Sequence, residues 1–492
     1  MKNTLKIYNT ITKKMESFIP NDPKTIKMYI CGPTVYDDSH IGHGRTYVMF
    51  DVIRSILEKY YNYNVVLVMN ITDIDDKIIN KANASGLNAY DVTKKYTKEF
   101  LEDMCSLNVR LPTRLTKVTD YIEKIGLFIK KLESNGFAYR SNGSVYFDVE
   151  KYKKAYDYPI FKSAEGINLD ACNVSEKNMV SEKRNVADFA LWKAAKKNEL
   201  YFEYDGLKGR PGWHIECSVM ASDVIGESID IHAGGVDLKF PHHENEIAQC
   251  QAYYQSRPWI KYFLHSGHLN IDGLKMSKSL KNFTTIREIL KTSTPNQLRI
   301  LFLNHQWSKD MNYETEELKF AQNYEKKIKN FISYANSKRY DAYEDTLSDK
   351  MFNETKDFEI LQMLEKTEND IDLSFSNNFD TPEVLKSISE LISSTNSAIK
   401  EISILTLFTV RDFINKILDI LGIEGPKATE SSGDAEALAD ILSSFRNKVR
   451  GFAKEGRDSK ELYGLCDELR EILKAKGFVI EDSKLSSVIK RF

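Results

Sequence analysis

One strand–helix–strand pattern near the N-terminus constrains the fold more than any other feature of the sequence. Residues 25–33, TIKMYICGP, form a short apolar run ending in Gly-Pro, as expected for a strand that enters a turn. From Val48 to Tyr60 the apolar side chains recur at the spacing of an amphipathic helix. Residues 63–75, YNVVLVMNITDID, are apolar throughout their centre, which is typical of a strand buried on both faces. Two buried strands joined by a helix predict a parallel sheet and an α/β fold.

The rest of the chain divides by composition and pattern. Residues 110–205 are richer in Lys, Tyr and Asn and weaker in pattern, apart from a strand-like run at 144–152, so we interpret this segment as an insertion. Apolar runs at 228–237 and 261–273 are again typical of buried strands in a parallel sheet. From about residue 282 onward the pattern is helical.

The composition is that of an ordinary globular protein, with 42% hydrophobic and 28% charged residues. The formal net charge of −2 means that a nucleic-acid partner would be met by local basic patches. No apolar run approaches the roughly 20 residues of a membrane span, and residues 1–18 lack the apolar core of a secretory signal. From these two observations we expect no membrane partner. The six cysteines lack the rhythm of a disulfide framework, which favours a reducing cytoplasmic setting.

Residues 39–45, SHIGHGR, lie between a predicted strand and its helix. Free backbone N–H groups at a helix N-terminus favour phosphate. The imidazoles of His40 and His43 would add donors to a phosphoryl group that gains charge in a transition state. Gly42 and Gly44 let a nucleotide approach the backbone closely. Taken alone, the motif fits two loop histidines beside a helix cap as well as it fits a nucleotide site.

Residues 274–282, LKMSKSLKN, form a basic run that includes Lys275 and Lys278. Lysines are mobile point charges that can follow a triphosphate through a reaction. For most Lys/Ser runs, however, a solvated basic loop is the correct interpretation.

Residues 239–250, KFPHHENEIAQC, place two histidines and two glutamates within five positions. Pro241 suits a first helical position, and helix residues four apart share a face. His242 and Glu246 are therefore predicted to project together, with His243 and Glu244 turned away. One imidazole and one carboxylate make half of a metal site.

Two cysteines could complete this site. Cys31 ends the first predicted strand and Cys217 follows a Gly/Pro-rich turn, so both are expected near the carboxyl ends of the sheet strands, where open α/β folds bind ligands. Cys250, one turn beyond Glu246, is a rival that spacing does not exclude. Singly, each cysteine is more often a small buried apolar residue. Two thiolates, an imidazole and a carboxylate favour zinc, with iron as the weaker option.

The motifs HIGH and KMSKS, in this order across about 230 residues, resemble the two nucleotide motifs of class I aminoacyl-tRNA synthetases. Within that class the chain is similar to the cysteinyl-tRNA synthetase family. The segments that carry this resemblance are CGPTVYDDSHIGHGR, NITDIDDKII, GRPGWHIECS, DIHAGGVDLKFPHHENEIAQ and GHLNIDGLKMSKSLKN.

The resemblance implies a role for each matching residue. The zinc ligands would be Cys31, Cys217, His242 and Glu246, without Cys250. His40 and His43 would stabilise the α-phosphate, and Lys275 and Lys278 would hold the leaving pyrophosphate. Gly42 and Asp237 would contribute to ATP binding, and Thr72 and Trp213 would line the amino-acid pocket. His232 is predicted near the bound cysteine and its adenylate.

The resemblance also implies the reaction and its partners. L-Cysteine would be activated with ATP and Mg²⁺ to cysteinyl-adenylate and then transferred to the 3′-terminal adenosine of tRNA(Cys). A simple pocket separates cysteine from serine by only about 10–200-fold, whereas zinc binds a thiolate far better than a hydroxyl. The expected enzyme is a cytoplasmic monomer with one zinc ion per chain.

The predicted architecture is a Rossmann-type parallel-sheet catalytic domain followed by helical tRNA-binding parts. Its expected segments are the first catalytic half (1–115), a connective insertion (116–205), the second catalytic half (206–281), a stem-contact region (282–330), a helical bundle (331–424) and an anticodon-binding domain (435–492). Residues 425–434, GPKATESSGD, would be the linker before the last domain.

Three rival interpretations share parts of this pattern. A cysteine ligase of the mycothiol type has the same adenylating core, but a small sugar acceptor does not need the helical and basic C-terminal parts. An inactive synthetase-like RNA-binding protein would not need both motifs and four metal ligands. A small-molecule adenylyltransferase with only the histidine motif does not account for the metal ligands.

Overall fold

A computed structural model gives the structure of the 492-residue chain. It describes residues 2–161, 181–196, 199–255, 258–271, 273–275, 283–344 and 352–426, and beyond them 445, 449, 464, 467–469, 471–474, 478–482 and 487–491. Residues 1–425 form one compact unit and 426–492 a second one. The second unit contains an antiparallel pair, β16 (Phe478–Asp482) with β17 (Ser487–Arg491), which the helical pattern did not predict.

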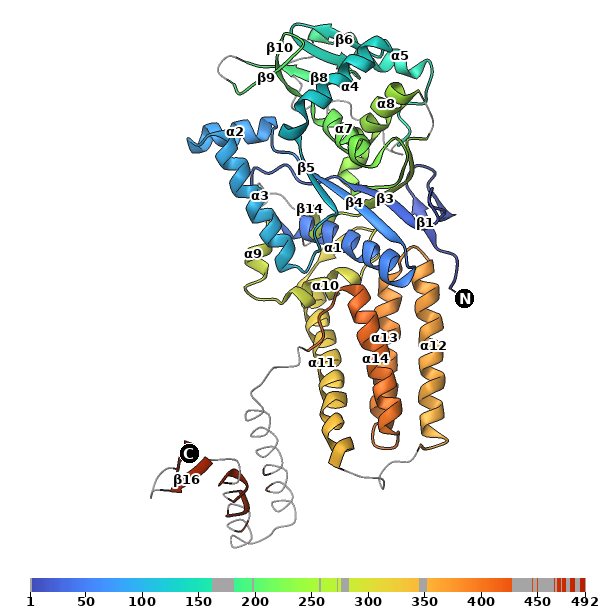
Figure 1. The fold of residues 1–492 in the computed structure, drawn as a ribbon, viewed down its shortest axis with the longest axis vertical. Coiled ribbons are helices and arrows are strands. Elements are labelled where there is room, and N and C mark those ends of the chain that lie inside the picture. The colour runs from blue at the N-terminus through green and yellow to red at the C-terminus, as the bar shows by residue number, and fades with distance from the viewer. Residues whose placement is uncertain are drawn as a thin grey trace. The chain divides into compact units, whose positions relative to one another are not determined.

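A five-stranded parallel sheet forms the centre of the first unit (Figure 1). Its order is β12 (Ile260–Ser266), β11 (Ile229–Gly235), β3 (Thr25–Ile30), β4 (Asn64–Ile71) and β5 (Arg114–Lys117). All four pairings are parallel, which confirms the predicted class of sheet. The predicted helix between β3 and β4 is α1 (Ile41–Ser55), continued by a π-helical turn at Ile56–Tyr60.

The strand order reverses direction between β3 and β11. From β3 the chain adds β4 and β5 on one side, whereas β11 and β12 extend the sheet on the other side. Such a reversal leaves a crevice at the carboxyl ends of the two strands, where open α/β sheets bind ligands.

Alternate residues of β3 face opposite sides of the sheet, as expected for a strand. Met28 and Ile30 belong to a core that includes residues of α1, whereas Tyr29 and Cys31 belong to a second core. This second core contains apolar residues of α7 (Trp213–Ile225) and α8 (Glu244–Tyr254). The pleat therefore directs Cys31 toward α7 and α8.

The segment predicted as an insertion contributes four strands to an antiparallel sheet, whose fifth strand, β10 (Leu207–Pro211), lies just beyond the predicted boundary at residue 205. The sheet has the order β6 (Ala138–Ser141), β7 (Ser144–Phe147), β8 (Phe189–Ala194), β10 and β9 (Phe202–Tyr204). Before it come α2 (Asp76–Ser85), α3 (Ala89–Ser106) and α4 (Ile122–Ser134), and α5 (Val149–Lys153) follows β7.

Smaller elements complete the catalytic part. β1 (Lys6–Asn9) pairs with β2 (Lys14–Ser17), and β13 (Leu269–Ile271) pairs with β14 (Leu274–Lys275) and with β15 (Met311–Tyr313). β15 lies in a region where the pattern predicted only helix. This prediction missed the strand because β15 pairs with a strand about 40 residues earlier in the chain, which local pattern does not reveal. The short α9 (Ile286–Ile289) and α10 (Pro295–Leu303) lead into the helical part.

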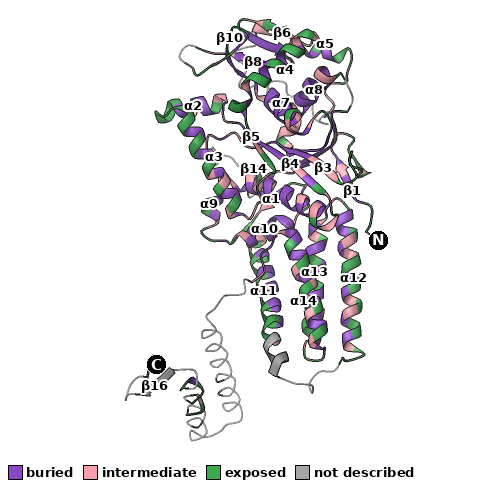
Figure 2. Cartoon of the chain, in the orientation of Figure 1, coloured by how far each residue is buried: buried purple, intermediate pink, exposed green. Residues whose placement is uncertain are grey.

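Four long helices, α11 (Thr315–Glu344), α12 (Lys356–Ser376), α13 (Thr381–Ala398) and α14 (Ile404–Leu421), lie side by side in a bundle (Figure 1). Buried and exposed positions alternate along them (Figure 2), as expected for helices that pack through one face. No helix of the described residues is both long and apolar enough to cross a membrane.

Candidate active site

The predicted site residues gather at the crevice between β3 and β11. Cys31 directly follows β3, and its backbone N–H donates to the carbonyl oxygen of Ala233 in β11 over 3.2 Å. A cavity of about 470 Å³ opens there. Predicted residues that line it are Cys31, His40, His43, Thr72, Trp213, Cys217, Asp237 and His242. A larger hollow of about 860 Å³ lies along α3, and none of the predicted site residues that the structure describes lines it.

Three of the lining residues, Cys31, Cys217 and His242, form a group of metal-donor atoms together with Glu246. Cys31 Sγ lies 3.7 Å from Cys217 Sγ and 3.7 Å from Glu246 Oε1, and His242 Nε2 lies 3.1 Å from the same Oε1. All four residues are buried. Bonds of about 2.0–2.3 Å to a tetrahedral ion imply donor separations of about 3.3–3.8 Å. The separations and the chemistry of this donor set therefore fit a metal ion such as zinc.

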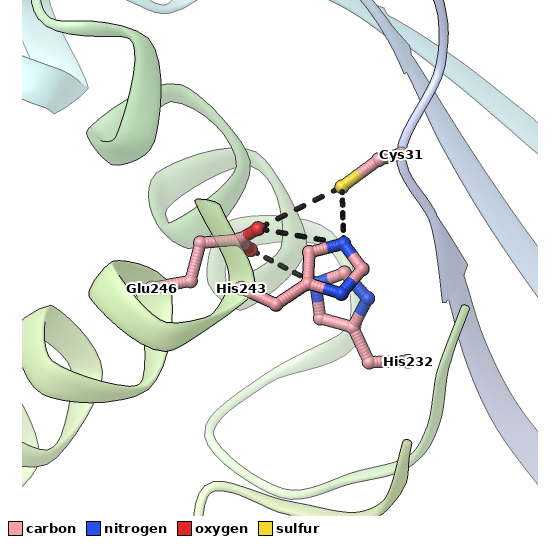
Figure 3. Close-up of side chains that lie close together, drawn as sticks. All are labelled: Cys31, His232, His243 and Glu246. Carbon is pink, nitrogen blue, oxygen red and sulfur yellow. Dashed lines mark hydrogen bonds and ion pairs between the residues drawn. The ribbon is translucent and has the colours of Figure 1, made fainter. Parts of the chain in front are cut away.

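A second donor group shares two members of the first one. It consists of Cys31, His232, His243 and Glu246 (Figure 3). His243 Nε2 lies 3.3 Å from Cys31 Sγ and 4.0 Å from Glu246 Oε1. The prediction that His243 is turned away is therefore wrong: residues three apart also share a helix face, and the sequence argument considered only a spacing of four. Glu244 is turned away as predicted, with its carboxylate accepting the N–H groups of Ile160 and Phe161 over 2.7 Å each.

A chain of hydrogen bonds orients His243. The hydroxyl of Thr10 donates to the carbonyl oxygen of Phe263 over 2.7 Å, so its oxygen accepts from Nδ1–H of His265 at 2.9 Å. Nε2 of a neutral His265 therefore carries no proton, and it accepts the Nδ1–H of His243 at 2.8 Å. A neutral His243 thus presents the lone pair of its Nε2 to Cys31.

Burial dominates the ionisation of the donor groups. It raises the pKa of the Cys31 thiol well above its usual range, and the neighbouring Cys217 adds to this effect. Burial also raises the pKa of Cys217 and lowers the pKa of His242 to about 3. The imidazole therefore stays neutral, which is its ligand form, whereas the thiols must lose protons when they bind a metal.

Cys250 joins neither donor group. It is fully buried, and its sulfur lies 4.0 Å from the hydroxyl of Ser222. The structure therefore places it among the small buried apolar side chains, which was the alternative interpretation of each cysteine.

The two motif histidines cap α1 at the mouth of the same cavity. Their rings stack with centroids 3.7 Å apart, and the backbone N–H of His43 donates to Nδ1 of His40 over 3.3 Å. The N–H of His40 donates in turn to Nδ1 of His43 over 3.5 Å. With both Nδ1 atoms accepting, each neutral ring carries its proton on Nε2. Burial lowers the pKa of His43 to about 4, so this ring is a neutral donor at physiological pH.

The other predicted residues lie at different depths. The Trp213 ring stacks on His242 with centroids 4.3 Å apart, and Asp237 lines the cavity beside Gly235. His232 is fully buried and lies behind Glu246, with its Nε2 2.9 Å from Oε2, and it is absent from the cavity lining. Gly42 lies in the first turn of α1 between the two histidines.

The basic motif is described only at its start. Lys275 is the last residue of β14, and its side chain is not described. Lys278 lies outside the described residues.

Three buried polar residues near the site were not singled out from the sequence. Asn70 and Glu216 contact Thr72, and Arg45 donates to the backbone carbonyl oxygens of Gly267 and His268. Asn70 and Glu216 lie in segments quoted for the family resemblance, and Asn70 is two residues from Thr72, the spacing of one strand face.

Comparison with known proteins decides the family. The family model described as "tRNA synthetases class I (C) catalytic domain" matches residues 17–323, more than half of the chain. A cysteine–tRNA ligase of Encephalitozoon cuniculi is 54% identical over 492 residues, with 100% of both chains covered. The chain belongs to the cysteine–tRNA ligase family.

Another relative agrees with this membership, and a solved structure shares the fold. The cytoplasmic cysteine–tRNA ligase of Dictyostelium discoideum is 40% identical, covering 99% of this chain and 78% of that one. The methionyl-tRNA synthetase of Mycobacterium tuberculosis, solved with methionyl-adenylate, superposes with a TM-score of 0.59 at 15% identity, covering 81% of this chain and 89% of that one. At this identity the superposition shows the fold alone, which is that of a class I synthetase.

Proposed function

We propose that the chain activates L-cysteine with ATP and Mg²⁺ and transfers the cysteinyl group to the 3′-terminal adenosine of tRNA(Cys). One observation carries the proposal: a single cavity is lined by the histidines that cap α1 and by three members of the Cys/His/Glu group. A phosphate-binding helix end and a thiol-binding cluster are what an enzyme needs to activate cysteine.

Cys31, Cys217, His242 and Glu246 would hold a zinc ion, which supplies selectivity for a thiolate over the hydroxyl of serine. Their fit to zinc rests on the donor separations of 3.1–3.7 Å. Trp213 stacks on His242 and would exclude water from the cysteine side chain.

In the first step a carboxylate oxygen of cysteine attacks the α-phosphorus of ATP, and the bond to pyrophosphate breaks. His40 and His43 would donate from Nε2 to the phosphoryl oxygens as charge develops there. Lys275 and Lys278 would hold the leaving pyrophosphate, while Gly42 and Asp237 would border the nucleotide. Catalysis would come from positioning and charge stabilisation, without a covalent enzyme nucleophile.

In the second step a ribose hydroxyl of the tRNA attacks the carbonyl carbon of cysteinyl-adenylate and releases AMP. Thr72 would hold the amino acid during both steps, and His232 would support Glu246 from behind. The bundle of α11–α14 and the second unit are the proposed tRNA-binding parts. The name of the Dictyostelium relative supports a cytoplasmic location, and the proposed active form is a monomer.

The test is transfer of labelled cysteine to unfractionated tRNA with ATP and Mg²⁺, with serine in a parallel reaction. Cysteine alone should be transferred, and the purified chain should contain about one zinc per molecule. Cys217→Ser should lose zinc and charging together. Cys250→Ser is the matched control, because this buried cysteine belongs to neither donor group, and it should keep both properties.

The outcomes separate the parts of the proposal. Cysteine-dependent exchange of pyrophosphate into ATP without tRNA charging would show that adenylation is right and the acceptor is wrong. Equal charging with serine, or full activity of Cys217→Ser, would refute the thiol-selecting site. Loss of both reactions in a folded, zinc-loaded chain would leave only an RNA-binding role.

A further inference from the structure

The α12–α13 turn (residues 377–381) has a backbone conformation that most side chains avoid. Asn378 and Phe379 both have a φ of 56°, in the left-handed region. Asparagine adopts this region readily, but a bulky residue rarely does. Phe379 is nevertheless buried in the core that contains residues of α1. A conformation of this kind persists where the surrounding contacts determine it, and such contacts often serve a function.

The α12–α13 turn is bonded to the catalytic part at several points. The N–H and the Oδ1 of Asn378 bond to the backbone of β1 over 2.8 and 2.9 Å. The carbonyl oxygen of Asn378 accepts the indole N–H of Trp307 over 2.9 Å. The hydroxyl of Thr381 donates to the carbonyl oxygen of Leu303 over 2.8 Å. The turn therefore holds both ends of the segment 303–307.

Trp307 connects the α12–α13 turn with α1 and with a second loop. Its buried ring packs against Phe50 of α1, with the ring centroids 6.1 Å apart. Its carbonyl oxygen accepts the N–H of Gly267 over 3.1 Å. A Cβ on Gly267 would lie 2.1 Å from the carbonyl oxygen of Lys309, so the two loops touch backbone to backbone. They therefore cannot shift independently of each other.

Arg45 joins these two loops to the start of α1, two residues after His43. Its guanidinium is buried, and it donates to four backbone carbonyl oxygens, those of Gly267 (2.6 Å), His268 (2.8 Å), Gln306 (3.3 Å) and Lys309 (2.5 Å). Burial lowers the pKa of Arg45 to about 10, so the group remains charged at physiological pH. The planar guanidinium holds several acceptors in fixed directions, which a lysine ammonium cannot do.

We infer that Trp307 and Arg45 are positioning residues through which the α12–α13 turn fixes the two motif histidines for the adenylation step. Among the described residues, none of those that line the cavity belongs to α11–α14, so the bundle acts on this step only through such a connection. The inference rests on the proposed function and gives the bundle a role in the first step besides tRNA binding. A small displacement of α1 is sufficient, because a misplacement of about 1 Å can cost about 100-fold in rate.

The test removes the indole N–H of Trp307 and keeps an aromatic ring. In the absence of tRNA, Trp307→Phe should lower the kcat of cysteine-dependent pyrophosphate exchange about tenfold, because the turn no longer holds α1 in place. The KM for cysteine should change less than about twofold, and the zinc content should stay the same, since the Cys/His/Glu group is untouched.

Trp192→Phe is the matched control for this substitution. Trp192 is also fully buried, in the insertion, and its indole N–H has no hydrogen-bond partner among the described residues. The control should keep its kcat within about twofold of the unsubstituted chain. In an Arg45→Lys background, which itself lowers kcat, Trp307→Phe should lower it by less than about a further twofold, because the connection is already broken.

A second pair of variants tests the other end of the segment 303–307. Thr381→Val removes the hydroxyl that donates to Leu303. Thr395→Val removes an equally buried hydroxyl with the same bond length of 2.8 Å, but its acceptor is Leu391 within α13. Thr381→Val should lower kcat about fivefold, the change that corresponds to one hydrogen bond, and Thr395→Val should not lower it.

Each outcome decides. Equal kcat values for Trp307→Phe and Trp192→Phe, or full additivity of Trp307→Phe with Arg45→Lys, would overturn the inference and leave the proposed function intact. Failure of the unsubstituted, zinc-loaded chain to exchange pyrophosphate would overturn both. If Trp307→Phe does not fold, as judged by its melting temperature, the threonine pair decides, and equal kcat values for Thr381→Val and Thr395→Val would refute the connection.

Discussion

Gly32→Ala should be among the most damaging single substitutions in the chain. Gly32 follows Cys31 at the end of β3, where the backbone passes directly against β4. A Cβ at this position would overlap the carbonyl oxygen of Asn70 and lie 2.8 Å from its carbonyl carbon. Real Cβ contacts are not this short, and the obstacle is backbone, so one of the two strand ends must move.

The size of the effect follows from what such a movement breaks. The N–H of Gly32 would lose Asn70 Oδ1 at 2.8 Å, and the pair of backbone bonds between residues 33–35 and Thr72, at 3.1 and 3.2 Å, would be strained. Overpacking costs about 1–3 kcal/mol, and each buried hydrogen bond lost adds about 1 kcal/mol. We expect the free energy of unfolding to fall by about 3–6 kcal/mol, a large part of a typical total.

The assay is urea unfolding, monitored by tryptophan fluorescence. The zinc content and the cysteine-dependent pyrophosphate exchange are also measured on the folded fraction. Because Cys31 is adjacent to Gly32, a shift of the strand end should also reduce the zinc content and the exchange activity. Gly425→Ala is the matched control, since a Cβ there has only Asn415 Oδ1 within 4 Å, at 3.7 Å. A Gly32→Ala chain that unfolds within about 1 kcal/mol of the unsubstituted one and keeps its zinc would refute this reasoning.

Other residues give three further predictions. Burial lowers the folded-state pKa of His43 to about 4, below its usual 6.5, so the unfolded chain binds the proton more readily and stability is lost as the pH falls below 6.5. His43→Gln should remove about 2 kcal/mol of that loss at pH 5, measured as the difference between the two chains in urea unfolding at pH 7.5 and pH 5. Trp213→Ala should keep the zinc but raise the KM for cysteine about tenfold in pyrophosphate exchange, because the ring stacked on His242 is lost. A chain that ends at residue 425 should keep cysteine activation within about twofold, while its KM for tRNA in the charging assay rises about tenfold or more through lost phosphate contacts.

Local periodicity was enough to predict much of this protein. The alternation of short apolar strands with an amphipathic helix predicted the parallel sheet, because both patterns depend only on neighbouring residues. The spacing of four between His242 and Glu246 predicted their shared face, and their atoms lie 3.1 Å apart. The expected positions of Cys31 and Cys217 near the strand ends made them candidates, with Cys250 as a rival, and the family resemblance excluded Cys250.

Other features depend on pairings that local spacing does not contain. The antiparallel sheet of the insertion and the strand β15 form only with partners distant in sequence, and their own patterns are weak. Asn70 and Glu216 carry no motif of their own, and their connection through Thr72 depends on α7 packing against β4.

By itself the sequence determined the class of fold, the family and the residue types available for chemistry. Periodicity and motifs depend only on residues that are close together in the chain, so the sequence shows them directly. Only the tertiary structure decided which of those side chains meet. It brought Cys31 from β3 to Cys217 in α7 because the pleat directs alternate strand residues to opposite faces of the sheet. The tertiary structure also placed His243 near Cys31 and Cys250 outside both donor groups. These contacts depend on how neighbouring elements pack, which the spacing of residues along one helix does not specify.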